Sequence, residues 1–231
     1  SAVSCPLAEL PARMPEQKIG HDRPVVFHCG GRTRAILSAQ VFAELGYSNP
    51  FYTIKNGTYG WLWSGFQTEH GANRVTPSPS VQQIQDGRAR VEALVDRVKL
   101  KCIDKATYEA WRTEAEVKCT YLFDVSPQGG AEHQMVPGST AVVGSQLITG
   151  IDRLVAVRDA RIILFDDTGI SSRVTGALLK QMGFKNTVVI DFIPEIGLPK
   201  LGGEFPQAEE VGAEELIENA GATAKIGRAH V

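Results

Sequence analysis

The chain has 231 residues, of which 43% are hydrophobic and 22% charged, a composition typical of a soluble globular protein with one large domain or two of ordinary size. Its net charge of −2 excludes the strong basic field that draws a whole protein to nucleic acid or to an anionic membrane, so we expect neither partner. No apolar run reaches the roughly 20 residues that a membrane-spanning helix needs.

The cysteine pattern bears on the compartment and on metal binding. The four cysteines, at positions 5, 29, 102 and 119, form no CxxC pair, and no cluster of His and Cys has the spacing of a zinc site. Four scattered cysteines in a chain of this length favour a reducing compartment over a disulfide framework. We therefore expect a cytoplasmic protein with no metal and no cofactor.

The first half of the chain reads as a strand, a tight loop and a helix. Residues 6–14 predict a short helix, and the apolar run 25–28 predicts a buried parallel strand. A loop spans 29–34, and residues 35–45 carry helical periodicity that ends at Gly46, a plausible C-terminal cap. Residues 51–54 predict a second short strand.

The second half repeats this order after a connecting region. Residues 71–80 have linker composition, and 80–99 predict an amphipathic helix on the domain surface. Further predicted elements are strands at 120–125 and 162–165, a turn at 166–170, a helix at 172–182 and a strand at 187–190. Cys29 precedes Gly46 by 17 positions and Asp166 precedes Gly183 by 17 positions, which indicates duplication.

A strand that ends at Cys29 and feeds a helix through two glycines has chemical consequences. The first amides of a helix lack internal partners, and together with the helix dipole they favour an anion at that end. Gly30 and Gly31 let the backbone curl without a Cβ, while Arg32 and Arg34 add positive charge. We expect the thiol to be largely ionised at neutral pH and nucleophilic toward anionic substrates. A buried, inert cysteine at a strand end is the alternative.

Residues 25–35, Val-Val-Phe-His-Cys-Gly-Gly-Arg-Thr-Arg-Ala, resemble the active-site loop of the rhodanese family. Residues 56–61 resemble the GG-x-x-x-W stretch of that family, with Asn56 in place of the first glycine. The resemblance implies an α/β fold of parallel sheets flanked by helices, with Cys29 as the catalytic residue. It also implies that the loop from Gly30 to Arg34 binds the substrate. The opening residues 1–3 resemble the run that follows the family's GHIPGA segment, so we expect the first domain to lack its opening strand.

The second half resembles the same family in a degraded form. Residues 122–126 resemble its first strand, with Ser126 in place of the usual arginine, and residues 133–139 resemble GHIPGA. The loop 166–171 matches the active-site loop in position, with Asp166 where the first half has Cys29. An aspartate forms no persulfide and repels an anionic donor, so we expect this half to be catalytically silent and to shape the pocket mouth.

The resemblance predicts a tandem arrangement. We expect an active, N-terminally truncated rhodanese-like domain at 1–73, a linker with the amphipathic helix at 74–114 and an inactive rhodanese-like domain at 115–204. A linker and the start of a further repeat follow at 205–225, and 226–231 read as a non-native tail. The number of repeats in the parent protein stays open.

The implied reaction is sulfur transfer from a small-molecule donor such as thiosulfate, through a Cys29 persulfide, to a thiol or cyanide acceptor. Two loop arginines favour a sulfonate-type donor over 3-mercaptopyruvate, but the loop matches the usual sequence of neither family closely, so the choice of donor stays open. A non-catalytic scaffold or a persulfide sensor is an alternative from another class. A cysteine phosphatase or arsenate reductase is less favoured, because its loop is Cys-x5-Arg, whereas here Arg34 ends the loop one position earlier and Ala35 follows.

Several other side chains invite a functional interpretation that we weigh against packing. Cys5 could act as a second thiol near the loop or be a packed helix-start residue, and Cys102 and Cys119 are expected to pack. His28 is expected to point away from Cys29, because side chains alternate along a strand. Trp61 and Trp63 are expected in the core or the pocket wall. Asp166 and Asp167 are expected in a solvated turn and not at a metal.

Overall fold

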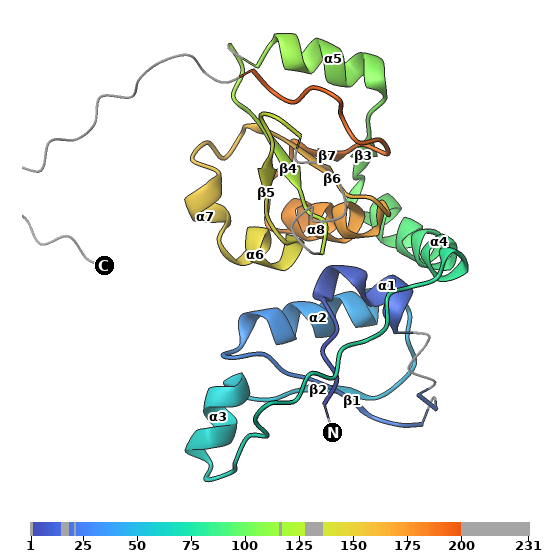
Figure 1. Ribbon diagram of the computed structural model, residues 1–231, viewed down its shortest axis with the longest axis vertical. Helices are drawn as coiled ribbons and strands as arrows, with labels where there is room; N and C mark the ends of the chain where they lie inside the picture. The colour runs from blue at the N-terminus through green and yellow to red at the C-terminus, as the bar shows by residue number, and fades with distance from the viewer. Residues whose placement is uncertain (1, 15–18, 21, 116, 128–135, 200–231) are drawn as a thin grey trace, which may run out of the picture. The chain divides into compact units, whose positions relative to one another are not determined.

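The computed structural model describes residues 2–14, 19–20, 22–115, 117–127 and 136–199 (Figure 1). The GHIPGA-like segment lies partly outside these residues, at 133–135. The start of a further repeat within 205–225 and the tail at 226–231 also lie outside them, so these predictions stay predictions. The described residues belong to one compact unit that spans 1–199.

The first sheet has two parallel strands that a helix connects. Strand β1 (Val25–Phe27) pairs with β2 (Phe51–Thr53) in the register Val26 opposite Tyr52, and α2 (Thr33–Glu44) lies between them in the chain. A short 3-10 helix, η1 (Leu7–Glu9), and the one-turn helix α1 (Leu10–Arg13) precede β1. These elements confirm the predicted strand–loop–helix–strand order.

The second sheet has five parallel strands in the order β3-β7-β6-β4-β5. The strands are β3 (Lys101–Cys102), β4 (Thr120–Asp124), β5 (Thr140–Ala141), β6 (Arg161–Phe165) and β7 (Thr187–Val189). The helices of this half are α4 (Val81–Val98), α5 (Lys105–Thr113), α6 (Gly144–Thr149), α7 (Ile151–Leu154) and α8 (Ile170–Gln181). The predicted α/β class, with parallel sheets flanked by helices, is confirmed.

Helix α4 begins where the sequence places a strong start signal. The Ser80 hydroxyl accepts a hydrogen bond from the Gln83 amide, and the Gln83 side chain accepts one from the Ser80 amide. This reciprocal capping satisfies two backbone donors that the helix itself leaves unpaired. The apolar face of α4 packs into the main core through Val91 and Leu94, both fully buried.

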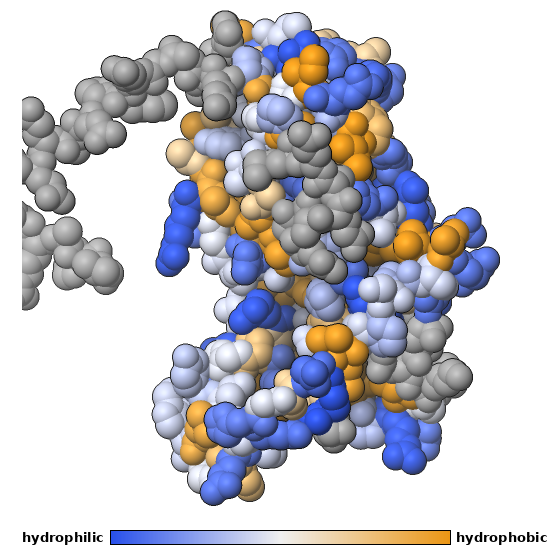
Figure 2. Space-filling view, in the orientation of Figure 1, coloured by the Kyte–Doolittle hydropathy of each residue, from blue (hydrophilic) through white to orange (hydrophobic). Residues whose placement is uncertain are grey.

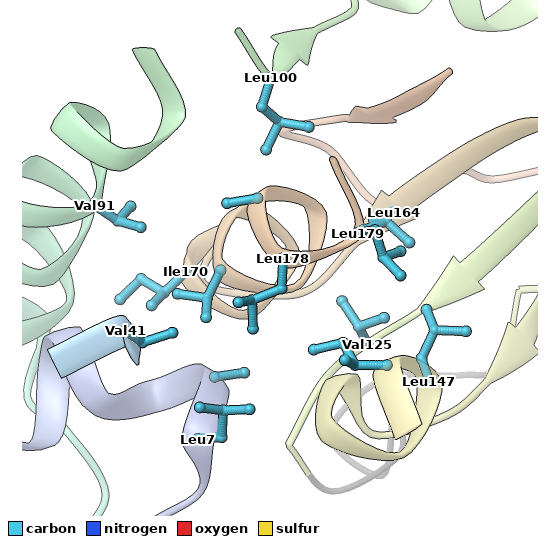
Figure 3. Packing of buried hydrophobic residues seen from close by; sticks show 14 of the residues in the cluster. Leu7, Val41, Val91, Leu100, Val125, Leu147, Leu164, Ile170, Leu178 and Leu179 are labelled. Atoms are coloured by element: carbon cyan, nitrogen blue, oxygen red, sulfur yellow. The ribbon is translucent and has the colours of Figure 1, made fainter. Parts of the chain in front are cut away.

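Two apolar clusters lie on opposite faces of the second sheet. Helix α8 lies in the midst of the larger cluster, where Ile170, Leu178 and Leu179 meet side chains from η1, α2, α4 and α6 (Figure 3). The smaller cluster forms on the other face around Tyr108 of α5 and Ile163 of β6. Strand β6 is therefore buried on both sides, which explains its continuous apolar sequence.

The two halves align with a constant offset. Helix α8 begins and ends 137 positions after α2, and Gly46 and Gly183 both adopt a positive φ, of 77° and 92°, just past the helix ends. Each of these glycines donates its amide to the carbonyl three residues earlier. The repeated geometry favours the predicted duplication. The domain boundaries at 73, 114 and 204 stay predictions.

No helix within the described ranges is both long and apolar enough to cross a membrane. The face seen in Figure 2 is mainly hydrophilic, with scattered apolar patches.

Candidate active site

The loop from Cys29 to Arg32 follows the carboxyl end of β1 and leads into the N-terminus of α2. Cys29 is a free, half-buried cysteine, and His28 before it is exposed. Ligand sites of open parallel sheets gather at this edge, because the loops after the strands meet there. The Cys29 thiol therefore lies at the edge of the sheet where parallel sheets present their loops to ligands.

Helix α3 (Gly57–Trp63) holds this loop from outside. The Thr58 amide donates to the Cys29 carbonyl at 2.8 Å, and the Thr58 hydroxyl donates to the same oxygen at 3.2 Å. The Tyr59 amide donates to the Gly30 carbonyl at 3.1 Å. The first amides of α3 thus donate hydrogen bonds to the carbonyls of the loop. These bonds fix the orientation of the loop against α3.

Gly57 makes this close approach possible. Its φ is 56°, and a Cβ at this position would lie 2.2 Å from the Cys29 carbonyl oxygen and 2.5 Å from the Gly31 carbonyl oxygen. No L side chain fits both the conformation and the space. Gly57 was not among the site residues expected from the sequence. The signal available was Asn56-Gly57 a few residues after a strand, a pair typical of left-handed backbone.

Gly30 and Gly31 serve the loop differently from the expectation. Neither has its φ in the left-handed region, and a Cβ on either would meet nothing within 4 Å. What these glycines supply is open space beside the thiol rather than relief from a clash. The residue that must be glycine for steric reasons is Gly57 of α3, which packs against the carbonyls of this loop.

The N-terminus of α2 carries positive charge and lacks a capping side chain. Arg32 is its N-cap residue, with φ −155° and no side-chain cap hydrogen bond. Arg32, Thr33 and Arg34 are exposed, and neither guanidinium forms an ion pair with any residue that the structure describes. The dipole of a 12-residue helix and two cations that pair with no described carboxylate thus act together at one end of the loop.

Asp166 occupies the position in the second half that is equivalent to Cys29, and its carboxylate lies where the loop amides could hold an anion. Its carboxylate accepts hydrogen bonds from the Thr168 amide at 3.1 Å, the Thr168 hydroxyl at 2.6 Å, the Ser171 amide at 3.4 Å and the Ser172 amide at 2.9 Å. Only 7% of Asp166 is exposed, so the expected solvated turn is wrong for Asp166, whereas Asp167 is exposed as expected. The reason is that the side chain itself satisfies the amides at the start of α8.

The Asp166 loop also lines a small cavity of about 110 Å³ together with Glu9 and Arg13 of the first half. Arg13 pairs with Glu9 at 2.8 Å and donates to the Thr76 carbonyl at 2.8 Å. Among the described residues, no group of three or more His, Cys, Asp or Glu side chains gathers to hold a metal ion.

The remaining cysteines are not brought to the Cys29 loop by any contact of the described residues. Cys5 packs against the main core, and burial raises its thiol pKa to about 11. Cys102 and Cys119 are exposed, so the expectation that they pack is wrong. Burial and the nearby Asp191 carboxylate raise the pKa of Cys102.

The expectation that the tryptophans of α3 lie in the core is wrong, and a place in the pocket wall stays a prediction. Trp61 is 40% exposed, with its indole N–H donating to the Gln67 carbonyl at 2.9 Å, and Trp63 is 76% exposed. Neither lies in the core, because α3 is fastened to the loop by its N-terminal amides and not by its aromatic face. Their spacing of two positions places them on different sides of a helix.

A rhodanese-like domain model matches residues 1–63. A crystal structure of thiosulfate sulfurtransferase from Pseudomonas aeruginosa is similar at 33% identity and a TM-score of 0.76. It matches 86% of this chain, and the chain spans 38% of its length.

A second matching structure is that of SseA from Escherichia coli, described with the "rhodanese" fold and catalytic mechanism of 3-mercaptopyruvate sulfotransferases. Its identity to this chain is 14% and its TM-score is 0.35. The match covers 81% of this chain and 72% of the SseA chain. No curated protein sequence matches the chain.

Proposed function

Because the chain belongs to the rhodanese-like family, we propose that it is a sulfurtransferase that carries a sulfane sulfur on Cys29 as a persulfide. One observation carries this proposal. A half-buried thiol stands at the N-terminus of a helix that no side chain caps, next to two exposed arginines without an acidic partner among the described residues. Such a site favours anionic sulfur.

The proposed reaction is a double displacement. The Cys29 thiolate attacks the outer sulfur of thiosulfate, a new sulfur–sulfur bond forms, and sulfite leaves with the electron pair of the donor's broken bond. A thiolate or cyanide then attacks the outer sulfur of the persulfide, and the Cys29 thiolate is released. Arg32 and Arg34 would orient the anionic end of the donor.

Asp166 indicates which backbone groups would hold the sulfur. Its carboxylate takes the amides two, five and six positions further along the chain. Helices α2 and α8 share the same offset from the two loops. The corresponding donors to the Cys29 sulfur would be the amides of Gly31, Arg34 and Ala35. Thr33 is the first residue of α2 and lies between Gly31 and Arg34 in the sequence.

The same comparison supports a silent second half. The Asp166 carboxylate already receives the hydrogen bonds that a bound anion would need, and it offers no sulfur to transfer. We therefore assign the sulfur chemistry to Cys29 alone, and we assign packing and the shaping of the pocket mouth to the loop at Asp166.

The test is thiocyanate formation from thiosulfate and cyanide, measured for the chain and for Cys29→Ser, with Cys119→Ser as the matched control at an exposed cysteine. We expect turnover in the wild type and in Cys119→Ser and none in Cys29→Ser. Replacing Arg32 and Arg34 together with Gln should raise KM for thiosulfate by about tenfold or more, because two charge-assisted contacts are lost.

Intact mass after thiosulfate treatment separates the alternatives. One added sulfur on Cys29 without thiocyanate would indicate a persulfide carrier. A folded wild-type chain that neither gains sulfur nor turns over would contradict the proposal and favour a scaffold. Hydrolysis of p-nitrophenyl phosphate in the absence of sulfur transfer would favour the phosphatase alternative instead.

A further inference from the structure

A basic pocket lies at the amino-end edge of the second sheet, at the opposite end of β6 from Asp166. The parallel strands β3, β6 and β7 begin there with Lys101, Arg161 and Thr187, and all three residues line it. The pocket has a volume of about 370 Å³. This size falls in the range of sites for small organic ligands.

Four lysines from separate segments face this pocket: Lys101 of β3, Lys118 before β4, Lys180 near the end of α8 and Lys185 before β7. No carboxylate in the described part of the chain forms an ion pair with any of them. The four positive charges therefore add within one concavity, and a ligand would need several negative charges to balance them.

Lys101 and Lys180 lie close enough for one charge to affect the other. Partial burial and the charge of Lys101 lower the pKa of Lys180. The Lys180 ammonium donates to the Lys185 carbonyl at 2.7 Å, which holds it at this edge and leaves two of its three N–H groups for other acceptors. The four lysines come from separate segments of the chain, and the fold brings all of them to the lining of one pocket.

The pocket also has an apolar wall. Ile103 and Trp111 are partly buried against the small cluster, and Val188 belongs to that cluster. All three line the pocket. The Arg161 guanidinium stacks over the Trp111 ring at 4.4 Å and pairs with Glu114 at 2.7 Å, so its charge is already matched and its role is to fix the indole.

We propose that this pocket binds a small organic phosphate that joins two or more phosphate groups to a planar apolar group, the class of a nucleoside polyphosphate. The lysines would take the phosphates, and the wall of Ile103, Trp111 and Val188 would take the planar group. This site is separate from the Cys29 loop, so the proposal stands whether or not the chain transfers sulfur.

The experiment is calorimetric titration of the folded chain with ATP, adenosine and inorganic pyrophosphate. The test variant replaces Lys101 and Lys185 together with Gln, since both side chains are exposed and neither supports the core. Lys105→Gln is the matched control, because this exposed lysine of α5 pairs with Glu195 outside the pocket. Circular dichroism checks that each variant is folded.

We expect ATP to bind the wild type and Lys105→Gln alike, and the double variant at least about tenfold more weakly. Adenosine should bind at least about tenfold more weakly than ATP, and raised salt should weaken ATP binding. Failure of ATP to bind the folded chain, or equal binding by the double variant, would overturn the proposal. Pyrophosphate binding as tight as ATP would overturn the role of the apolar wall.

Discussion

Cys29 and Asp166 lie 137 positions apart, and each is the first residue of one of two equivalent loops. The side chain at this position decides which chemistry the loop can support. The aspartate brings its own negative charge and closes on the amides of Thr168, Ser171 and Ser172. Cys29 brings no carboxylate to the start of α2, where no side-chain cap hydrogen bond forms, so this helix end is open to an anionic donor.

The pKa differences among the thiols predict an order of reactivity. Only a thiolate is alkylated readily, and with a pKa of about 11 roughly one Cys5 thiol in a thousand is ionised at pH 8. Burial and Asp191 also raise the pKa of Cys102. We expect iodoacetamide at pH 8 to modify Cys29 before Cys102 and Cys5, as peptide mass spectrometry would measure. Modification of Cys5 first would contradict the burial that raises the pKa of that thiol.

Gly57 offers a second prediction at this scale. Gly57→Ala combines left-handed strain with a Cβ placed 2.2 Å from the Cys29 carbonyl oxygen. We expect a loss of about 2–4 kcal/mol in the free energy of unfolding and at least a tenfold fall in kcat/KM, because the loop must move. Urea unfolding and thiocyanate kinetics measure the two effects.

Gly46→Ala is the matched control for this substitution. Its φ is 77°, but a Cβ there would meet nothing within 4 Å. It should carry the backbone strain alone, about 1–2 kcal/mol, and leave kcat/KM unchanged. Equal effects of the two substitutions would show that contact with the loop plays no part.

At the scale of elements, sequence patterns located the strands and long helices well. Predicted strands at 162–165 and 187–190 agree with β6 and β7, because buried parallel strands give continuous apolar runs. The strand predicted at 25–28 agrees with β1 in position, but its expected burial is wrong, because Val26 is exposed. The family resemblance pointed to residues 56–61, yet periodicity did not reveal helix α3. Its seven residues leave only Gly57 buried, so no apolar face marks it. The same lack of a packed face explains the misplaced tryptophans.

An ion-pair network joins α4, α8 and the segment after β7, and no local sequence pattern could reveal it. Arg173 of α8, with 7% of its side chain exposed, contacts Asp191 at 2.7 Å and Glu92 of α4 at 3.0 Å, and Arg88 of α4 contacts Asp191 at 2.8 Å. The partners lie up to 103 positions apart, so only the fold brings them together.

This network predicts an acid-dependent stability. Hydrogen bonds from Arg173 hold the pKa of Asp191 below its ordinary value. A carboxyl with a lowered pKa stabilises the fold above the pKa of the unfolded state, near 4, and loses that contribution as the pH falls through the folded pKa. Asp191→Asn should cost about 1–2 kcal/mol at pH 7, discounted because 38% of the side chain is exposed.

Urea unfolding between pH 7 and pH 3 measures this difference. The gap between the wild type and Asp191→Asn should stay constant from pH 7 to about pH 5 and shrink below about pH 4. Asp86→Asn, at an exposed position of α4, is the control. A gap that widens in acid would contradict the sign of the Asp191 shift.

For the molecule as a whole, the two repeated halves bury their sheets unequally. In both halves one face of the sheet packs on the main core, through Val25 and Phe27 in β1 and through Ile162 and Leu164 in β6. The opposite face of β6 is covered, and Ile163 is fully buried beside α5. Val26, the residue equivalent to Ile163, is 52% exposed. Sequence alone could not show this difference, because both strands read as apolar runs.

The same substitution at these two positions should therefore have very different costs. Ile163→Thr removes apolar contacts and buries a hydroxyl in the cluster around Tyr108, so we expect a loss of about 2–4 kcal/mol in the free energy of unfolding. Val26→Thr changes a half-exposed surface and should stay within about 0.5 kcal/mol. Urea unfolding of both variants measures the costs. A large cost at Val26 would mean that this face of the first sheet is covered in the folded chain, and that the two halves bury their sheets alike.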